Sequence, residues 1–216
     1  MADMKAIQTR RILMSVFGVV ICGISVGMFK HAALGVDPFQ SLMSGLDAVI
    51  PIRFGTLYVL ANVLLLGFAL LMDRHKIGIA TLINLFLLGY VAEFSQAVFA
   101  SLFPALGIAG RVVLLLVAVL IICVASSLYF TADLGVSTYD AVSLIWSEKQ
   151  KRIPFRFCRI ICDLICVVLG AVLCRAGDVA VIGVVGIGTI ITAFFMGPLI
   201  DYFNGHLAEP LLYGKQ

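Results

Sequence analysis

The sequence contains six apolar stretches that are each long enough, or nearly long enough, to cross a lipid bilayer. A membrane-spanning helix needs about 20 mostly apolar residues. None of the stretches alternates apolar and polar residues with a period of two, which disfavours a transmembrane barrel, and a backbone in lipid then satisfies its own hydrogen bonds as helices. We therefore predict an all-α transmembrane fold. The six predicted spans are residues 12–29, 56–72, 77–100, 112–131, 157–174 and 179–200.

The composition excludes several classes of protein. Hydrophobic residues make up 62% of the chain and charged residues 12%, whereas soluble domains are about half apolar and a quarter charged. With a mean hydropathy of +1.13, a soluble globule, a disordered chain and a disulfide-stapled secreted domain are excluded. The net charge of +3 without a dense basic stripe offers nothing to a phosphate backbone. We expect a single membrane domain over residues 1–216, surrounded by lipids and without a nucleic-acid partner.

Lysine and arginine are unevenly distributed between the two predicted sides of the membrane. With the N-terminus inside, eleven of them fall on or near the inner side and four fall outside. Short loops rich in these residues stay in the cytoplasm, so the sequence predicts that both termini are cytoplasmic. The first apolar run follows basic residues, as a signal peptide does. It is too long for one and lacks a small-residue cleavage site, so we expect it to be retained.

Two short motifs occur twice in the chain. The motif Leu-Gly-Val at 34–36 returns at 134–136, and Gly-Ile-Ala-Thr at 78–81 returns as Gly-Ile-Gly-Thr at 186–189. After the second motif the register continues without a gap for more than three helical turns. Chance similarity between two apolar helices is the alternative explanation, and the pairing of the two motifs argues against it. The sequence therefore indicates an internal duplication.

The duplication predicts an inverted arrangement of the two halves. Repeat one covers about 12–100 and repeat two about 112–204, and each holds three predicted spans. An odd number of spans reverses the second copy relative to the membrane, so an axis in the membrane plane should relate the two three-helix repeats. Many secondary transporters are built in this way. The functional prediction rests on this architecture, although a fold does not by itself fix a function.

A short capped helix is predicted after the first span of each half. Asp37 is a good N-cap followed by Pro38 and, three residues after the cap, Gln40; Ser137 and Asp140 repeat the cap and its partner. About a dozen residues are too few to span a membrane. The helix is either amphipathic and interfacial, or re-entrant with its N-terminus facing a cavity that attracts an anion or a polar solute. The cap carboxylates argue against the second interpretation, because they already accept from the N–H groups.

Two charged residues lie four positions apart on one face of the fifth span, Arg159 and Asp163. An ionisable residue within a span is costly and indicates function by default. The pair is either a self-neutralised structural pair near the inner end, or a site in which Arg159 offers its planar fork to a carboxylate or phosphate while Asp163 orients it. Repeat one has the uncharged Tyr58 and Asn62 at the equivalent positions. One asymmetric charge on a symmetric scaffold is expected of a single solute site between the repeats.

Glu93 and Asp201 occupy equivalent positions near the ends of the two repeats. They are either helix-end residues at the lipid headgroups or acids that couple transport to protons. The predicted site therefore has two parts, a solute-binding set and a coupling pair. The solute-binding set is Arg159, Asp163, Arg156, Asn62, Asp37 and Asp140, and the coupling pair is Glu93 and Asp201.

The sequence contains no motif that indicates an enzyme. Cys158, Cys162 and Cys166 share one helical face, which could suggest a soft-metal site, but their counterparts in repeat one are apolar and a buried cysteine behaves as a small hydrophobe. No HExxH motif, serine elbow or P-loop is present. We therefore expect no enzymatic activity, no metal site and no cofactor.

Several of these motifs together resemble one family. The pattern is similar to the YczE/YitT-like family of bacterial integral membrane proteins and covers residues 18–203. One departure lies at Ser137 and Thr138, where the family pattern has a further glycine and a proline. The resemblance implies a bacterial inner-membrane protein and brings no established activity. The motifs that carry it are residues 34–39, 134–140, 155–159 with Asp163, 186–189 and 196–199.

The leading functional hypothesis is a small secondary transporter or solute-binding protein of the inner membrane. Its solute would be small and polar or anionic, bound near the midplane between the repeats. The alternative is a substrate-capturing or accessory membrane subunit of a larger assembly, without transport activity of its own. The sequence is compatible with a homo-oligomer and identifies neither the solute nor a coupling ion.

Overall fold

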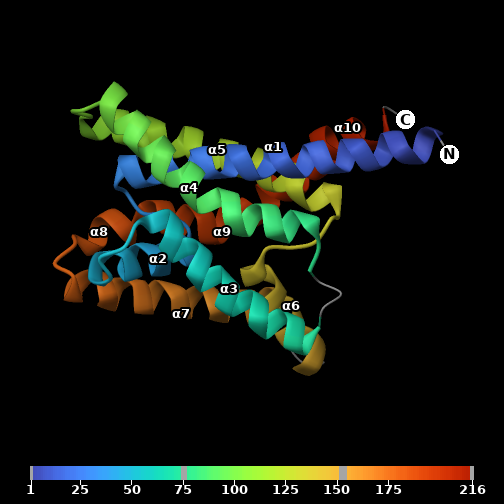
Figure 1. The fold of residues 1–216 in the computed structure, drawn as a ribbon. Coiled ribbons are helices and arrows are strands. Elements are labelled where there is room, and N and C mark those ends of the chain that lie inside the picture. The colour runs from blue at the N-terminus through green and yellow to red at the C-terminus, as the bar shows by residue number, and fades with distance from the viewer. Residues whose placement is uncertain (1, 74–76, 151–154, 215–216) are drawn as a thin grey trace.

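We describe the protein from a computed structural model, which covers residues 2–73, 77–150 and 155–214, and the side chains of these residues except 2–6 and 155–156. Within these residues every regular element is a helix (Figure 1). This confirms the predicted all-α class. The helices are α1 (Ala2–Ala32), α2 (Pro38–Val49), α3 (Phe54–Met72), α4 (Ile79–Leu102), α5 (Ile108–Ala132), α6 (Thr138–Gln150), α7 (Phe155–Ala176), α8 (Val181–Val184), α9 (Ile187–Phe203), η2 (Asn204–Ala208) and α10 (Glu209–Tyr213).

Six of the helical segments are long and apolar enough to cross a membrane, which confirms the six predicted spans. The last one differs from its prediction. It begins with the short α8 and continues through α9, the π-helix η2 and α10, so it reaches Tyr213 rather than ending at Ile200. Pro198 lies inside α9 without ending it. The six segments are Ile7–Ala32, Phe54–Met72, Ile79–Leu102, Ile108–Ala132, Phe157–Ala176 and Val181–Tyr213.

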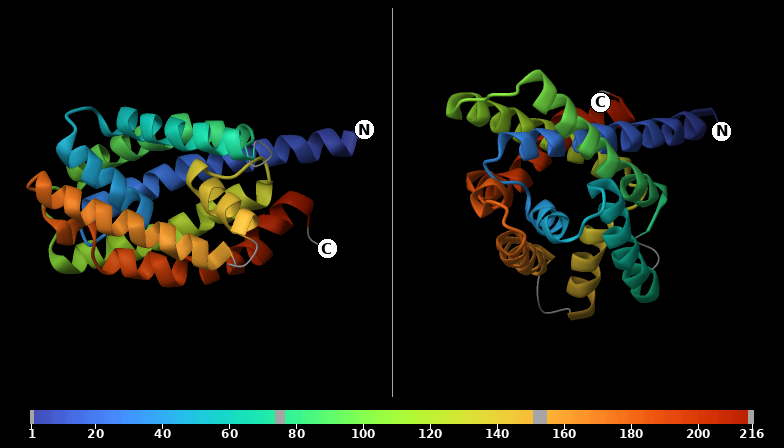
Figure 2. Two further views of the ribbon diagram at one scale, coloured as in Figure 1. Left: turned by 90° about the horizontal axis from the view of Figure 1, so that it is seen from below. Right: turned by 60° about the vertical axis from the view of Figure 1, so that its left-hand side comes forward.

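Both ends of the chain lie at the same end of the helix bundle, which we call the terminal end; we call the opposite end the distal end (Figures 1 and 2). Six membrane-spanning segments are an even number, so they bring the chain back to the side on which it began. Helix α3 begins at the distal end and α4 begins at the terminal end (Figure 1). That the terminal end faces the cytoplasm stays a prediction from the charge distribution.

The outer surface of the spans is apolar. Leu64, Leu71, Phe94 and Phe194 are each at least 70% exposed. Soluble monomers rarely expose continuous apolar surface on this scale, whereas a bilayer favours it. The exposed side chains therefore mark the surface that contacts lipid tails.

Helix α1 packs between α4 and α5 through small residues. A Cβ atom added to Gly18 would lie 2.9 Å from the Ala125 carbonyl oxygen, and one added to Gly27 would lie 2.5 Å from the Ser95 hydroxyl. Small residues let helix backbones approach closely where no hydrophobic effect drives helices together in lipid. Any larger side chain at these positions would force α1 away from its neighbours.

The short helix α2 lies against α7, which belongs to the other half of the chain. An added Cβ on Gly170 of α7 would lie 2.4 Å from the Ser41 carbonyl oxygen, and one on Gly177 would lie 2.4 Å from that of Ala48. The two helices therefore run in contact along most of α2. Its counterpart α6 packs on α3 and α7, so each short helix contacts a long helix of the opposite half.

The two Leu-Gly-Val segments make equivalent contacts in opposite halves. The Leu34 carbonyl accepts a hydrogen bond from the Gly188 N–H at 2.8 Å, and the Leu134 carbonyl accepts one from the Ala80 N–H at 3.0 Å. Each segment thus reaches the start of a long helix in the other half. The two contacts agree with the internal duplication, and the inverted symmetry of the complete halves stays a prediction.

Glycine is required at the centre of both segments. Gly35 has φ +105° and Gly135 has φ +110°, a region that residues with a Cβ rarely adopt. We call the two Leu-Gly-Val segments, 34–36 and 134–136, the glycine hinges. Their central glycines have nearly the same φ angle, although Ser137 and Thr138 follow the second hinge where the resemblance led us to expect a glycine and a proline.

Candidate functional site

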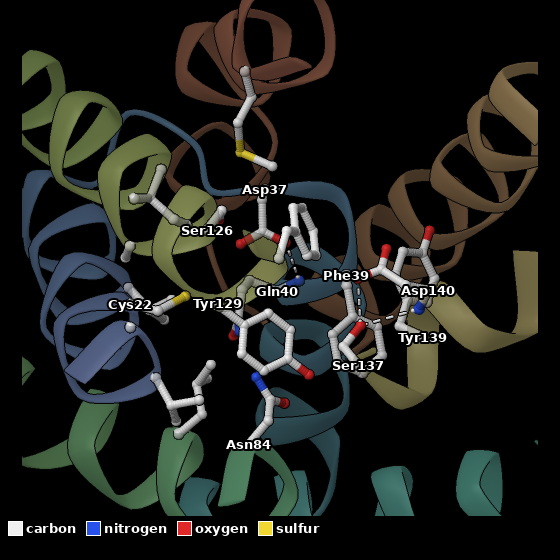
Figure 3. A pocket seen from close by; sticks show the side chains of 18 of the residues that line it. Cys22, Asp37, Phe39, Gln40, Asn84, Ser126, Tyr129, Ser137, Tyr139 and Asp140 are labelled. Carbon is white, nitrogen blue, oxygen red and sulfur yellow. Dashed lines mark hydrogen bonds between the residues drawn. The ribbon is translucent and has the colours of Figure 1, made fainter. Parts of the chain in front are cut away.

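The N-terminal turns of the two short helices meet inside the bundle. The rings of Phe39 on α2 and Tyr139 on α6 stack with their centroids 4.9 Å apart. Both rings are less than 10% exposed. Figure 3 shows the two caps, Asp37 and Ser137, together with Phe39 and Tyr139 among the side chains that line one pocket. The placement favours the re-entrant interpretation of α2 and α6 over helices that lie flat at the membrane surface.

Side-chain caps close the N-termini of both short helices. Asp37 accepts a hydrogen bond from the Gln40 N–H at 3.2 Å, as the sequence predicts. At the start of α6, Ser137 accepts from the Asp140 N–H at 3.0 Å and donates its hydroxyl proton to the Asp140 carboxylate at 2.6 Å. Each cap therefore satisfies an N–H group that would otherwise be left unpaired.

Asn62 ties α3 to the start of α6. The side-chain oxygen of Asn62 accepts a hydrogen bond from the Thr138 hydroxyl, and its amide nitrogen donates to the Tyr58 carbonyl at 2.8 Å. Asn62 is 1% exposed. The structure places this predicted binding residue at the wall of the central cavity, where its main contacts hold the two halves together.

Arg159 is shared between two carboxylates. It pairs with Asp163, one turn later on α7, at 3.1 Å, and with Asp140 on α6. Its guanidinium also lies over the Tyr139 ring, 4.6 Å from the centroid, and the Tyr139 hydroxyl donates to Asp163 at 2.6 Å. The Arg159–Asp163 contact is confirmed. The sequence did not reveal the contacts with Asp140 and Tyr139, which bring a second helix to the same arginine.

Asp37 faces the same cluster from α2. It lies in the connection between two helices and not in any of the six spans. Burial is the largest influence on its carboxyl and raises its pKa to about 6, while the Gln40 N–H and the charge of Arg159 act in the opposite direction. A buried carboxyl disfavours its charged form. Asp37 can therefore change its charge within the neutral to mildly acidic range.

Two adjoining cavities contain this cluster. The central one has a volume of about 110 Å³ and is lined by residues of α1 to α7 and of α9 (Figure 3). The second has a volume of about 450 Å³ and extends between α6, α7 and the C-terminal half of α9. Both are lined by Asp37, Asp140 and Arg159. The shared residues therefore stand where the larger cavity reaches the centre of the protein.

Gln40 lines the central cavity and was not a sequence-based site candidate. It is 3% exposed, and its side-chain oxygen has no hydrogen-bond partner among the residues that the structure describes. Buried polar atoms are usually paired, so this oxygen is available to a ligand. The sequence signal was present, because Gln40 stands in the first turn of the capped helix, but it was assigned to the cap alone.

The other predicted site residues lie apart from the cluster. Glu93 pairs with Arg53 at 2.9 Å near the distal end, and Asp201 is exposed late in α9. Neither lines the two cavities. Arg156 is the second residue of α7, and its side chain is not among those that the structure describes. The structure thus unites Arg159, Asp163, Asp140, Asp37 and Asn62.

Comparisons with known proteins give a family without an assigned activity. The model of the DUF6198 family, described as a family of unknown function, matches residues 9–205. Uncharacterized protein YyaS of Bacillus subtilis is 24% identical over 186 residues, which are 86% of this chain and 88% of that protein. An uncharacterized protein of Haemophilus influenzae is 22% identical over 204 residues, 94% of this chain and 87% of that protein.

The predicted resemblance to the YczE-like family is confirmed. Uncharacterized membrane protein YczE of Bacillus subtilis is 25% identical over 134 residues, which cover 61% of this chain and 60% of that protein. No solved structure matches the chain.

Proposed function

This chain belongs to the DUF6198 family of unknown function, and we propose that it is a secondary transporter of a small polar solute. The observation that carries the proposal is the meeting of two capped half-helices, one from each half of the chain, at a polar cavity. Broken or half-length helices that meet at a central site are a recurring way to bind solutes in transporters. The predicted inverted repeats and the predicted bacterial inner-membrane location support the same role.

We infer that access to the proposed site is from one side of the membrane. The 450 Å³ cavity lies between α6, α7 and α9, and α6 is on the terminal side of the centre (Figure 1). Toward the distal end, the Lys30 ammonium lies 3.3 Å from the centroid of the Phe54 ring, and Arg53 pairs with Glu93. A transporter open to one side and closed to the other has this asymmetry. With a cytoplasmic terminal end, the cavity would open inward.

Asp37 is the acid that best suits proton coupling. The sequence suggested Glu93 and Asp201, but neither lines a cavity. Asp37 lines both cavities and has a raised pKa. A solute and a proton could therefore compete for, or share, one site. We propose this role for Asp37 in place of the two sequence candidates.

Reconstitution tests the proposed transport. Purified protein is screened by thermal shift against a library of metabolites, and each stabilising compound is assayed for uptake into sealed proteoliposomes. A Ser126→Leu variant would fill the central cavity, which Ser126 lines, and Ser101→Leu makes the same change at an exposed position of α4. We expect uptake by the wild type and Ser101→Leu, and loss of uptake in a folded Ser126→Leu variant.

The same assay separates the two functional hypotheses. A compound that binds at the cavity but is not taken up, with solute gradients in either direction, would contradict transport. That result would favour the alternative of a substrate-capturing or accessory subunit.

A further inference from the structure

The side chains around the two cavities carry more negative than positive charge. Among the side chains that the structure describes, the linings include the carboxylates of Asp37, Asp140 and Asp163 and a single guanidinium, that of Arg159. With all four groups ionised the cluster has a formal charge of −2. A site of low polarity that holds excess negative charge attracts a positive ligand, because the charges interact more strongly there than in water.

The single arginine is already engaged. Its guanidinium pairs with Asp140 and Asp163 and covers the face of Tyr139. An incoming anion would have to displace two carboxylates from this guanidinium and would itself lie close to them. The Arg159 guanidinium, which the sequence analysis considered as a binding group for an anion, is therefore already paired with carboxylates of the protein.

The groups that remain accept hydrogen bonds or attract cations. The side-chain oxygen of Gln40 is buried in the central cavity without a partner among the described residues. Asp37 uses one carboxylate oxygen to cap α2. Phe39, which also lines the central cavity, adds an aromatic ring, and aromatic faces bind cations favourably. A ligand that donates hydrogen bonds and carries positive charge matches all of these groups.

We propose that the central site binds a small organic cation with N–H donors, such as a guanidinium or ammonium compound. Arg159 is then a resident cation that holds the carboxylates while the site is empty and competes with the ligand for them. This inference rests on the proposed function, because it names the class of solute for the same site. It selects a cation, whereas the sequence analysis expected a small polar or anionic solute.

The dimensions of the cavities suit a cationic head and a short apolar tail. A volume of about 110 Å³ is several times the roughly 30 Å³ that a water molecule occupies in the liquid, so it accepts a head group of a few heavy atoms. The adjoining 450 Å³ cavity is lined by Phe130, Ile160 and Met196 as well as the charged residues. The tail would lie against these apolar side chains.

A matched pair of probes tests the charge of the ligand. n-Butylguanidinium chloride and sodium valerate share a four-carbon chain and differ in the charged head. Their affinities are measured at pH 7.5 by calorimetry on protein in nanodiscs, with the fluorescence of Trp146 on α6, the single tryptophan, as a second readout. We expect the cation to bind at least about tenfold more tightly than the anion.

Two site variants and one control sharpen the test. Arg159→Gln removes the competing cation, so affinity for n-butylguanidinium should rise about tenfold. Asp37→Asn keeps a good N-cap residue but removes a carboxylate, so affinity should fall about tenfold. Arg175→Gln changes an exposed arginine of the same helix α7 and should leave both affinities unchanged. If Arg159→Gln does not fold, Asp37→Asn carries the test.

Tighter binding of valerate, loss of all binding in folded Arg159→Gln, or binding of neither probe would each overturn the inference. Valerate uptake that depends on the cavity would overturn the cation inference and leave the proposed transport intact. Specific cation binding without uptake would support the cation site and contradict transport.

Discussion

At the scale of single residues, the site depends on the charge of Asp37. Its carboxyl lies at the N-cap of α2 and faces ionisable groups on several helices. Protonation would remove one of three negative charges from the cluster. Among the described residues, the other ionisable groups around it are Cys22, Tyr58, Tyr129, Tyr139, Asp140, Arg159, Asp163 and Cys166.

We predict that cation binding depends on pH through this residue. The raised pKa of about 6 means that Asp37 takes up a proton as the pH falls through that value, so affinity for n-butylguanidinium should fall between about pH 7 and pH 5. Calorimetry across this range measures the effect. Asp37→Asn should bind more weakly at pH 7 and should lose most of the pH dependence. An unchanged pH profile in this variant would assign the dependence to another group.

Most residues of the site could be predicted from the sequence, but the contacts that join them between helices could not. Arg159 and Asp163 were paired correctly because they lie one helical turn apart, and local spacing predicts such contacts. Asp140 was included in the solute-binding set as the cap partner of Ser137, but its contact with Arg159 was not predicted. Its contact with Arg159 joins α6 to α7, and no local pattern shows which carboxylate another helix will bring to an arginine. Tyr139 was not among the predicted site residues for the same reason.

At the scale of elements, the two glycine hinges hold the half-helices in place. Each hinge contacts the start of a long helix in the other half at very short range. A Cβ atom on Gly35 would lie 2.7 Å from the Gly186 nitrogen, and one on Gly135 would lie 2.5 Å from the Gly78 nitrogen. No side chain can be added at either hinge without moving two elements.

We predict that Gly35→Ala and Gly135→Ala both destabilise the protein. The positive φ costs an alanine about 1–2 kcal/mol, and the overlap with backbone adds about 1–3 kcal/mol. Thermal unfolding in detergent should show a clearly lower melting temperature for each variant. Gly67→Ala in the middle of α3, where an added Cβ meets nothing within 4 Å, should be neutral or slightly stabilising. Equal melting temperatures for all three variants would contradict the hinge assignment.

Helix boundaries were predictable where polar residues interrupt the apolar runs, and less so elsewhere. The last span was expected to end at Ile200, before Asp201, yet the chain continues as η2 and α10. One acid near a helix end does not stop a helix whose next turns still pack, as Ala208 and Leu212 do in a small cluster with Met14. The depth of α2 and α6 could not be decided either, because helical spacing alone does not show what covers a helix.

At the scale of the whole molecule, Arg53 and Glu93 form an ion pair near the distal end, where the proposed transporter is closed. The Glu93 carboxylate also accepts a hydrogen bond from the Gly55 N–H at 3.2 Å. The Arg53 side chain is 74% exposed, and exposed ion pairs contribute about 0.2–1 kcal/mol. The pair can therefore bias the proposed closed state only modestly, as the proposed reversible transport cycle requires.

We predict that Arg53→Gln increases access to the site from the distal end. A cysteine at Ser126 in a cysteine-free background reports access through its labelling by an impermeant maleimide applied from that side. The labelling rate should rise by up to about fivefold, which corresponds to the upper value for an exposed pair. Arg111→Gln, at an exposed arginine near the start of α5, should not change the rate. Equal labelling rates in Arg53→Gln and Arg111→Gln would contradict a role of the Arg53–Glu93 pair in restricting access.

The hydrogen bonds between the first glycine hinge and the second half of the chain also determine when the first half-helix can be fully held during biosynthesis. The Leu34 carbonyl and the Gly35 and Val36 N–H groups find their partners between Gly183 and Gly188, which the ribosome makes only with the last span. Chains are made from the N-terminus onward, and unpaired backbone groups are costly in lipid. The first half-helix therefore stays incompletely held until the sixth span has been inserted. A chain truncated before that span should lack the complete proposed solute site even though its first three spans are complete.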